Sequence, residues 1–169
     1  HTSLILVKDF DDYENIGNTT DDAVGEAYDK AAKILNLGYP GGPVIERAAK
    51  NGNSASIKFP KSLLKADNLD FSFSGIKTAV LYYVQKNASR LALTANRIPL
   101  TADICASFQD SVIDVIVEKS VKALRQNGIG TLVVGGGVSI NSRLRERLKM
   151  DCGRLNINVY FPLNRLCLD

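Results

Sequence analysis

The chain has 169 residues, 45% of them hydrophobic and 23% charged, which is typical of a globular protein with one sizeable core. Its formal net charge of +3 permits a nucleic-acid partner without requiring one. No apolar run approaches the roughly 20 residues that span a bilayer, so we expect no membrane association. Three cysteines without paired spacing predict reduced thiols and a cytoplasmic protein.

The first part of the chain alternates strand and helix patterns. Residues 2–8 and 13–19 are each predicted as a strand, and the polar turn between them indicates a hairpin. A helix is predicted from about 21 to 37, because capping residues and acids stand at its start. The turn at 38–43, rich in glycine and proline, ends that helix, and a second helix is expected from 43 to about 50.

The rest of the chain continues this alternation. Helices are predicted where apolar residues recur at helical spacing, and strands where they alternate. The predicted strands are 54–59, 71–74, 131–134 and 156–161, and the predicted helices are 75–95, 101–126 and 142–150. The pattern as a whole favours an α/β architecture.

A glycine-rich turn, Gly135, Gly136 and Gly137, lies between a predicted strand and a predicted helix. Glycine has no Cβ, so the backbone can turn sharply there and approach a ligand. Asn141 stands where either a helix N-cap or a nucleotide-contacting amide would stand. Both a phosphate or nucleoside site and a plain strand-to-helix turn fit this stretch equally well.

Two further stretches carry polar groups that could face a ligand. Asp22, Glu26 and Asp29 are spaced to lie along one side of a helix, where a carboxylate could accept hydrogen bonds from ribose hydroxyls. A solvated face paired with neighbouring lysines is the commoner explanation. The turn at 40–43, followed by Glu46, leads into a helix N-terminus, where backbone amides could face a ligand. A turn that simply ends one helix and starts the next explains the same residues equally well.

Other kinds of site have weaker support. His1 is the only histidine, so the chain contains no two-histidine metal motif and no convincing Ser/His/Asp or Cys/His triad. Residues 71–102 contain no acidic residue but several basic ones, and arginines also crowd the predicted helix at 142–150. Such basic stretches could contact a nucleic-acid backbone, although a solvated face is more common.

Four motifs together resemble one known family. They are TDDAVGEAYDK (20–30), YPGGP (39–43), DFSFSGIKTA (70–79) and VGGGVSINSRLR (134–145). In this order and at these separations they are similar to the bacterial-type tRNA N6-adenosine threonylcarbamoyltransferases, formerly classed as O-sialoglycoprotein endopeptidases or glycoproteases. The resemblance covers essentially the whole chain and is far more specific than any single glycine turn.

The resemblance implies an actin-like ATPase fold of the sugar-kinase and heat-shock-chaperone type, incomplete here and carrying a helical insertion. The insertion would span about 43–100, and the nucleotide-binding core about 1–42 and 101–169. The implied reaction transfers a threonylcarbamoyl group from threonylcarbamoyl-AMP to N6 of the adenosine 3′ of the anticodon, in tRNAs that read codons starting with A. Asp29, Gly42, Glu46 and Asn141 match positions that contact the adenylate or ATP, with Gly135–Gly137 beside them.

The resemblance also implies one divalent metal ion, iron or zinc. Asp169 matches the family's acidic metal ligand, in a Cys-Leu-Asp sequence where the family has Cys-Thr-Asp-Asn, and the two metal-binding histidines of the family have no counterpart. His1-Thr2 matches the end of a Gly-Gly-His-Thr loop without its glycines. We therefore expect a C-terminal half-enzyme that is inactive by itself.

The expected partners are tRNA, the missing N-terminal half and the accessory proteins of bacterial threonylcarbamoyl-adenosine synthesis. Two alternatives stay open at this point. One is a metal-dependent endopeptidase, after the older family name, although no motif here supports peptide hydrolysis. The other is a noncatalytic relative that binds a partner enzyme through the same surfaces.

Overall fold

The computed structural model describes residues 1–62, 64 and 67–167, and of residues 94–96 only the backbone. Strands β1 (Ser3–Asp9) and β2 (Asp12–Asn18) form an antiparallel hairpin, and β3 (Thr131–Val133) and β4 (Asn158–Tyr160) form a parallel pair. The helices are α1 (Val24–Ile34), α2 (Gly41–Ala49), α3 (Ser74–Lys86), α4 (Ala88–Ala92), α5 (Thr94–Asn127) and α6 (Ser142–Gly153), with short 3-10 helices η1 (Gly137–Ile140) and η2 (Asn164–Leu166). The α/β architecture predicted from the sequence is confirmed.

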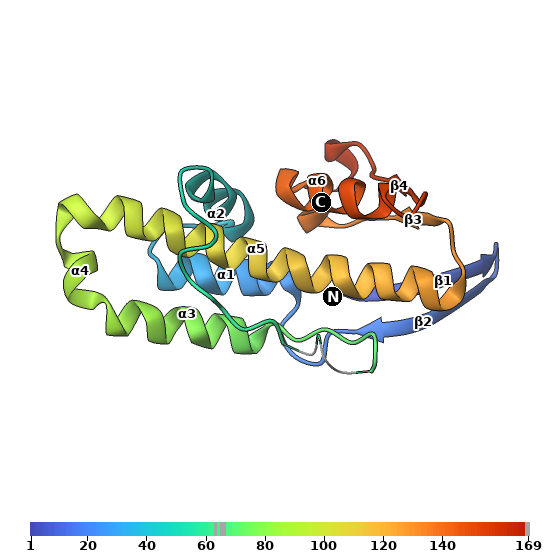
Figure 1. The fold of residues 1–169 in the computed structure, drawn as a ribbon, viewed down its shortest axis with the longest axis horizontal. Coiled ribbons are helices and arrows are strands. Elements are labelled where there is room, and N and C mark those ends of the chain that lie inside the picture. The colour runs from blue at the N-terminus through green and yellow to red at the C-terminus, as the bar shows by residue number, and fades with distance from the viewer. Residues whose placement is uncertain (63, 65–66, 168–169) are drawn as a thin grey trace.

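Helix α5 is the central element, and α1, α2, α3, α4 and α6 all contact it or lie beside helices that do (Figure 1). Its apolar residues recur every fourth position, so Ile104, Phe108 and Val112 form one stripe that is fully buried. Gly128 ends the helix in a left-handed conformation, with φ of +64°. The predicted end of this helix at 126 is thereby confirmed to within one residue.

The hairpin, α1, α2, α6 and the last strand fall where the sequence predicted them, with ends shifted by a few residues. The predicted strand at 54–59 is wrong. Its alternating pattern arises because Ile57 and Phe59 are buried against the helices while their neighbours face outward. The backbone amide of Ile57 donates to the Ser107 hydroxyl on α5 (3.3 Å) instead of to a strand.

The predicted strand at 71–74 is reduced to a single bridge between Phe71 and Thr19. Asp21 explains why a helix begins instead. One oxygen of its carboxylate accepts hydrogen bonds from the backbone amides of Phe73 (2.8 Å) and Ser74 (3.2 Å), and so serves amides at the start of α3. A residue more than fifty positions away performs the capping role, which local sequence does not show.

The helix predicted at 75–95 is divided into α3 and α4, and α5 begins at Thr94, earlier than the predicted start at 101. Pro99 lies within the first two turns of α5 rather than before it. Leu100 and Ile104, which follow it, are buried in the core, so packing holds this end of the helix. Figure 1 shows α3 and α5 side by side, joined at one end of the molecule by α4.

The two pairs of strands remain separate sheets. A groove of about 510 Å³ lies between them, lined by consecutive residues of β1 (3–7) and of β3 (131–133). Ala123 and Leu124 of α5 form part of its wall. Within the described chain, each of these two strands pairs with a neighbour on one edge only.

Candidate functional site

A cavity of about 330 Å³ lies where α1 and α2 meet the segment that leads into α6. Five residues singled out from the sequence line it: Asp29, Gly42, Glu46, Gly137 and Asn141. The other lining residues are Gly25, Tyr28, Pro40, Pro43, Val138 and Ile140. Its size falls at the lower end of the range of about 300–1,000 Å³ that is usual for small-molecule sites. The fold thus brings the neighbouring motifs at 20–30 and 39–43 together with the distant motif at 134–145.

The two glycines at the start of α2 have different structural roles. A Cβ at Gly41 would lie 2.5 Å from the Tyr28 carbonyl oxygen, so α1 and α2 can approach this closely only with glycine there. The Gly41 amide donates to the Asp29 carboxylate (2.7 Å), which fixes that side chain at the cavity wall. A Cβ at Gly42 would meet no protein atom within 4 Å. Gly42 therefore leaves open space at a position that lines the cavity.

Asn141 is the N-cap of α6, one of the two roles that its position in the sequence allowed. Its side-chain oxygen accepts from the Leu144 amide (3.0 Å), and its side-chain nitrogen donates to the Gln109 amide oxygen (2.8 Å). The residue is only 5% exposed. Both the oxygen and the nitrogen of the side-chain amide are thus hydrogen-bonded within the protein. Asn141 therefore borders the cavity as a fixed, buried group.

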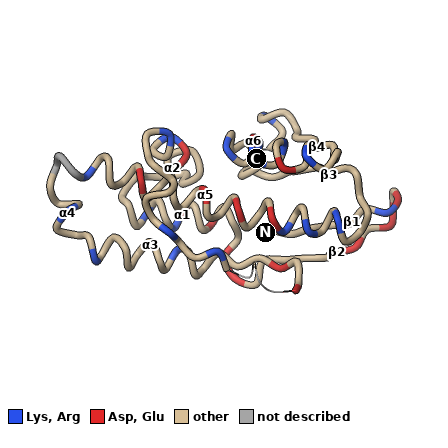
Figure 2. Tube along the Cα trace, viewed as in Figure 1, with Lys and Arg blue, Asp and Glu red and all other residues tan. Residues whose placement is uncertain are grey.

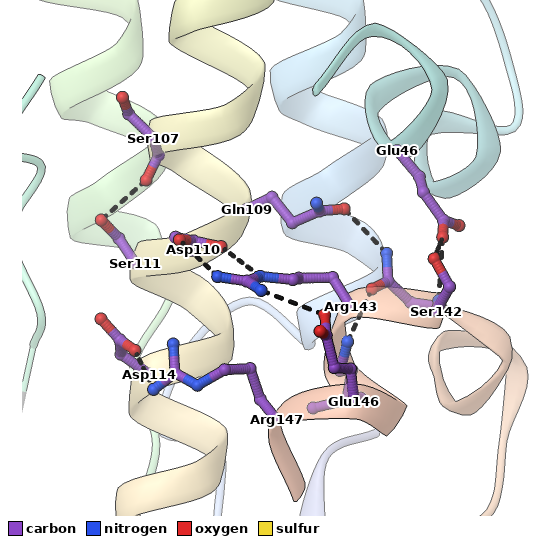
Figure 3. Close-up of polar contacts among 12 residues, drawn as sticks. Glu46, Ser107, Gln109, Asp110, Ser111, Asp114, Ser142, Arg143, Glu146 and Arg147 are labelled. Atoms are coloured by element: carbon purple, nitrogen blue, oxygen red, sulfur yellow. Dashed lines mark hydrogen bonds and ion pairs between the residues drawn. The ribbon is translucent and has the colours of Figure 1, made fainter. Parts of the chain in front are cut away.

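Glu46 joins α2 to the start of α6. Its carboxylate accepts hydrogen bonds from the Ser142 amide (2.8 Å) and from the Ser142 hydroxyl (Figure 3). A carboxylate at this place also interacts favourably with the positive end of the α6 dipole. The sequence pointed to Glu46 as a ligand contact, and the structure gives it a clamping role at the edge of the cavity.

Tyr28 was not singled out from the sequence, although it precedes Asp29 in the same motif. The side chain is fully buried, and its ring packs edge-on against Phe108, with 5.2 Å between centroids. Burial, with smaller contributions from Glu46 and Asp110, strongly raises the pKa of its hydroxyl, so the phenol stays protonated. Among the described residues its hydroxyl has no hydrogen-bond partner.

Ion pairs behind the cavity hold α6 against α5 (Figure 3). Arg143 donates to both oxygens of Asp110 (3.1 and 3.3 Å), and Arg147 contacts Asp114 (2.8 Å). Burial alone would raise the pKa of Asp110, but hydrogen bonds from Arg143 and Ser54 and the charges of the two arginines lower it on balance. The basic residues of α6 named here therefore serve its packing.

The carboxylate row predicted along α1 is divided between two roles. Lys30 binds Asp22 and Glu26 (2.6 Å each), and Lys77 also binds Asp22 (2.9 Å). Glu26 is half exposed and paired with Lys30, as the commoner explanation expected, whereas Asp22 lies before α1 and its side chain is only 13% exposed. Asp29 alone reaches the cavity.

The remaining predicted residues lie outside this cavity or outside the described chain. Gly135 and Gly136 are exposed and do not line the cavity, and Gly136 supplies the sharp turn with φ of +84°. Asp169, the predicted metal ligand, falls outside the described residues. Within the part of the chain that is described, no three histidine, cysteine, aspartate or glutamate side chains lie close enough to hold a metal ion.

The fold and this cavity define an α/β protein with a candidate ligand site, where polar groups converge near the starts of two helices. The profile of the tRNA N6-adenosine threonylcarbamoyltransferase family matches residues 1–169, and the chain belongs to that family. None of the helices among the described residues is both long and apolar enough to cross a membrane.

Individual relatives agree with this assignment. The chain is 50% identical to the tRNA N6-adenosine threonylcarbamoyltransferase of Desulfotalea psychrophila over 99% of its length, and 46% identical to that of Clostridium botulinum strain 657 over its whole length. It spans about half of each of these relatives, 48% in both cases.

A solved structure shares the fold at low sequence identity. Full-length HypF, in a phosphate- and nucleotide-bound form, superposes with a TM-score of 0.60 at 16% identity, covering 86% of this chain and 18% of HypF. At this identity the likeness concerns the fold alone.

Proposed function

We propose that the chain is the adenosine-binding part of an enzyme that transfers a threonylcarbamoyl group from threonylcarbamoyl-AMP to N6 of the adenosine 3′ of the anticodon in tRNAs reading codons that start with A. The observation that carries this proposal is the cavity that brings Asp29, Gly42, Glu46 and Asn141 together, in a chain that belongs to the threonylcarbamoyltransferase family. We further propose that the fold is an incomplete actin-like ATPase fold.

The chemistry asks mainly for positioning. Threonylcarbamoyl-AMP is a mixed anhydride and is already activated. The N6 amine attacks the carbamoyl carbon, the bond from that carbon to the AMP phosphate oxygen breaks, and the amine loses one proton as AMP leaves. Holding the two reactants in the correct geometry supplies much of the acceleration in such reactions.

The described residues are suited to the nucleoside end of this substrate. Asp29 is held by Gly41, so its carboxylate can accept hydrogen bonds from ribose hydroxyls at a fixed place. Gly42 leaves room beside it for the sugar or base. Asn141 and Glu46 fix the opposite wall by tying the start of α6 to α5 and α2.

The described residues do not make a metal site. The family's iron or zinc would need ligands beyond them, because the described residues contain no cluster of three suitable side chains and the one histidine of the sequence, His1, is exposed. We therefore assign no step to a metal. The other parts of the site would come from the half of the enzyme that the relatives have beyond this chain, and from accessory proteins. We place this reaction on tRNA in the cytoplasm.

A Gly42→Ala substitution in the full-length protein is the sharpest test. The added methyl meets no protein atom, so the thermal midpoint should not fall. It occupies the space proposed for the nucleoside, so we expect nucleotide affinity to fall at least about tenfold, or about 1.4 kcal/mol. Gly153→Ala is the matched control, since it also adds a methyl to a helix where nothing lies within 4 Å.

Isothermal titration calorimetry with ATP or AMP measures the nucleotide affinity of both variants and of the parent. Equal affinity for the parent and Gly42→Ala would remove this cavity from nucleotide binding. Asn141→Ala is a poorer test, because it removes a helix cap as well as a cavity wall.

The alternatives differ in product. Full-length protein incubated with threonylcarbamoyl-AMP and unmodified tRNA should yield modified adenosine, detected by nucleoside mass spectrometry. Release of peptides from a glycoprotein without modified adenosine would instead support an endopeptidase. Neither product, with nucleotide binding intact, would support a noncatalytic relative.

A further inference from the structure

The charges of this molecule are unevenly distributed. Residues 71–102 hold four of the chain's 21 basic residues and none of its 18 acidic ones, so the rest of the chain carries one more acidic than basic residue. The net positive charge therefore comes entirely from α3, α4 and the beginning of α5. Figure 2 shows blue without red along these three segments.

Three of these basic residues gather where α3 turns into α5 through α4. Lys86 is the last residue of α3, Arg90 lies in α4, and Arg97 lies in the first turn of α5. All three are exposed, and none has an ion-pair partner among the described residues. Lys77, farther back on α3, is neutralised by Asp22 (2.9 Å). We use the name basic tip for Lys86, Arg90 and Arg97 together.

Exposed side chains that are not charged adjoin the basic tip. Tyr82 lies one helical turn before Lys86, on the same face of α3, and is 65% exposed. Leu93 and Ile98, which flank the start of α5, are also exposed. An aromatic ring beside unpaired cations is the combination that proteins use to bind unpaired nucleotides, with the ring stacking on a base and the cations contacting phosphates.

We propose that the basic tip and Tyr82 form an RNA-binding surface that contacts the phosphate backbone of the tRNA outside the reaction site. The tip lies at one end of the molecule, whereas the helices that form the cavity lie nearer its middle (Figure 1). RNA is favoured over an acidic protein because the tip offers cations with no ion pair among the described residues, next to an exposed ring, in a segment (71–102) without acidic residues. The identity of the RNA rests on the proposed function.

The test removes three charges from the full-length protein as Lys86→Gln, Arg90→Gln and Arg97→Gln combined. Binding of an unmodified tRNA transcript is measured by filter binding across a series of salt concentrations. The affinity falls as salt rises, and each lost phosphate contact makes this slope of log affinity against log salt less steep by about 0.7–0.9. We therefore expect the magnitude of the slope to decrease by about 2–3 in the triple variant. Tyr82→Ala should weaken binding at every salt concentration while leaving the slope unchanged.

The matched control is Arg125→Gln, Lys149→Gln and Arg165→Gln, which removes three exposed charges elsewhere. An equal loss in this control would show a general effect of net charge and overturn the proposal. Unchanged tRNA binding by the tip variant would also overturn the proposal. This holds equally if the variant no longer binds an accessory protein, because the tip would then be a protein-binding surface. ATP affinity should be the same in the parent, tip variant and control.

These readouts separate the two proposals. Parent protein that binds no tRNA would contradict the proposed function itself. Parent protein that binds tRNA as tightly as the tip variant would contradict only the RNA-binding surface.

Discussion

The helical part of the molecule and its strand part differ in how completely their apolar side chains are buried and their polar groups are paired. Around α5, apolar side chains such as Ile104, Phe108 and Val112 are fully buried, and charged pairs lock α6 in place. The strands form two separate pairs with an apolar groove between them, and Ile5, Val7 and Val133 remain exposed. The difference shows that the helices carry the stability of this chain, while the strands present edges that further chain could pair with.

The largest predicted effect follows directly from this comparison. Phe108→Ala removes a fully buried ring that also packs against Tyr28, and should lower the free energy of unfolding by about 3–5 kcal/mol. Phe10→Ala, in the hairpin turn, removes a ring that is 93% exposed and should change it by less than about 0.5 kcal/mol. Urea denaturation followed by circular dichroism compares the two. Similar losses would contradict the division into a stabilising helical part and a loosely held strand part.

An intermediate effect is expected where the candidate site depends on the helical part. Asn141→Ala removes the α6 cap and leaves the Gln109 side chain without its partner, and should cost about 2 kcal/mol. Asn158→Ala, at the exposed start of β4, is the control and should be nearly neutral. The same denaturation measurement applies. A neutral Asn141→Ala would mean that the cap and the amide pair add nothing to the wall of the cavity.

The smallest effect concerns Asp22, where the hairpin leads into α1. Hydrogen bonds from Lys30 and Lys77 lower the pKa of this carboxyl in the folded protein, outweighing its burial. A lowered folded pKa contributes stability that is complete above the unfolded value of about 3.9 and is lost as the pH falls through the folded value. Asp22→Asn should therefore be less stable than the parent at pH 7, and the two should converge as the pH falls through the lowered folded pKa of this carboxyl.

Thermal melts from pH 7 down to about pH 2, below the unfolded pKa, measure this convergence. Glu14→Gln is a suitable control, because the Lys8–Glu14 pair of the hairpin is well exposed and should contribute little at any pH. A constant difference between Asp22→Asn and the parent across the range would show that the loss is not linked to the titration of this carboxyl.

Local sequence determined most of the elements of this protein. The apolar spacing of 101–126 defined the central helix because its buried stripe repeats at the helical period, and Gly128 marked its end. The motifs likewise indicated Asp29, Gly42, Glu46 and Asn141, because these residues match positions that contact the adenylate or ATP in the family that the sequence resembles.

Only the tertiary structure decided what those residues do. The side-chain nitrogen of Asn141 found a partner in Gln109, thirty-two residues earlier, and α3 began at Ser74 because Asp21 reaches its amides. Ile57 and Phe59 alternate like a strand, yet they pack on helices and take part in neither sheet of the described residues. Each of these outcomes depends on a partner far away in the chain, and short-range patterns contain no information about which distant group will be near.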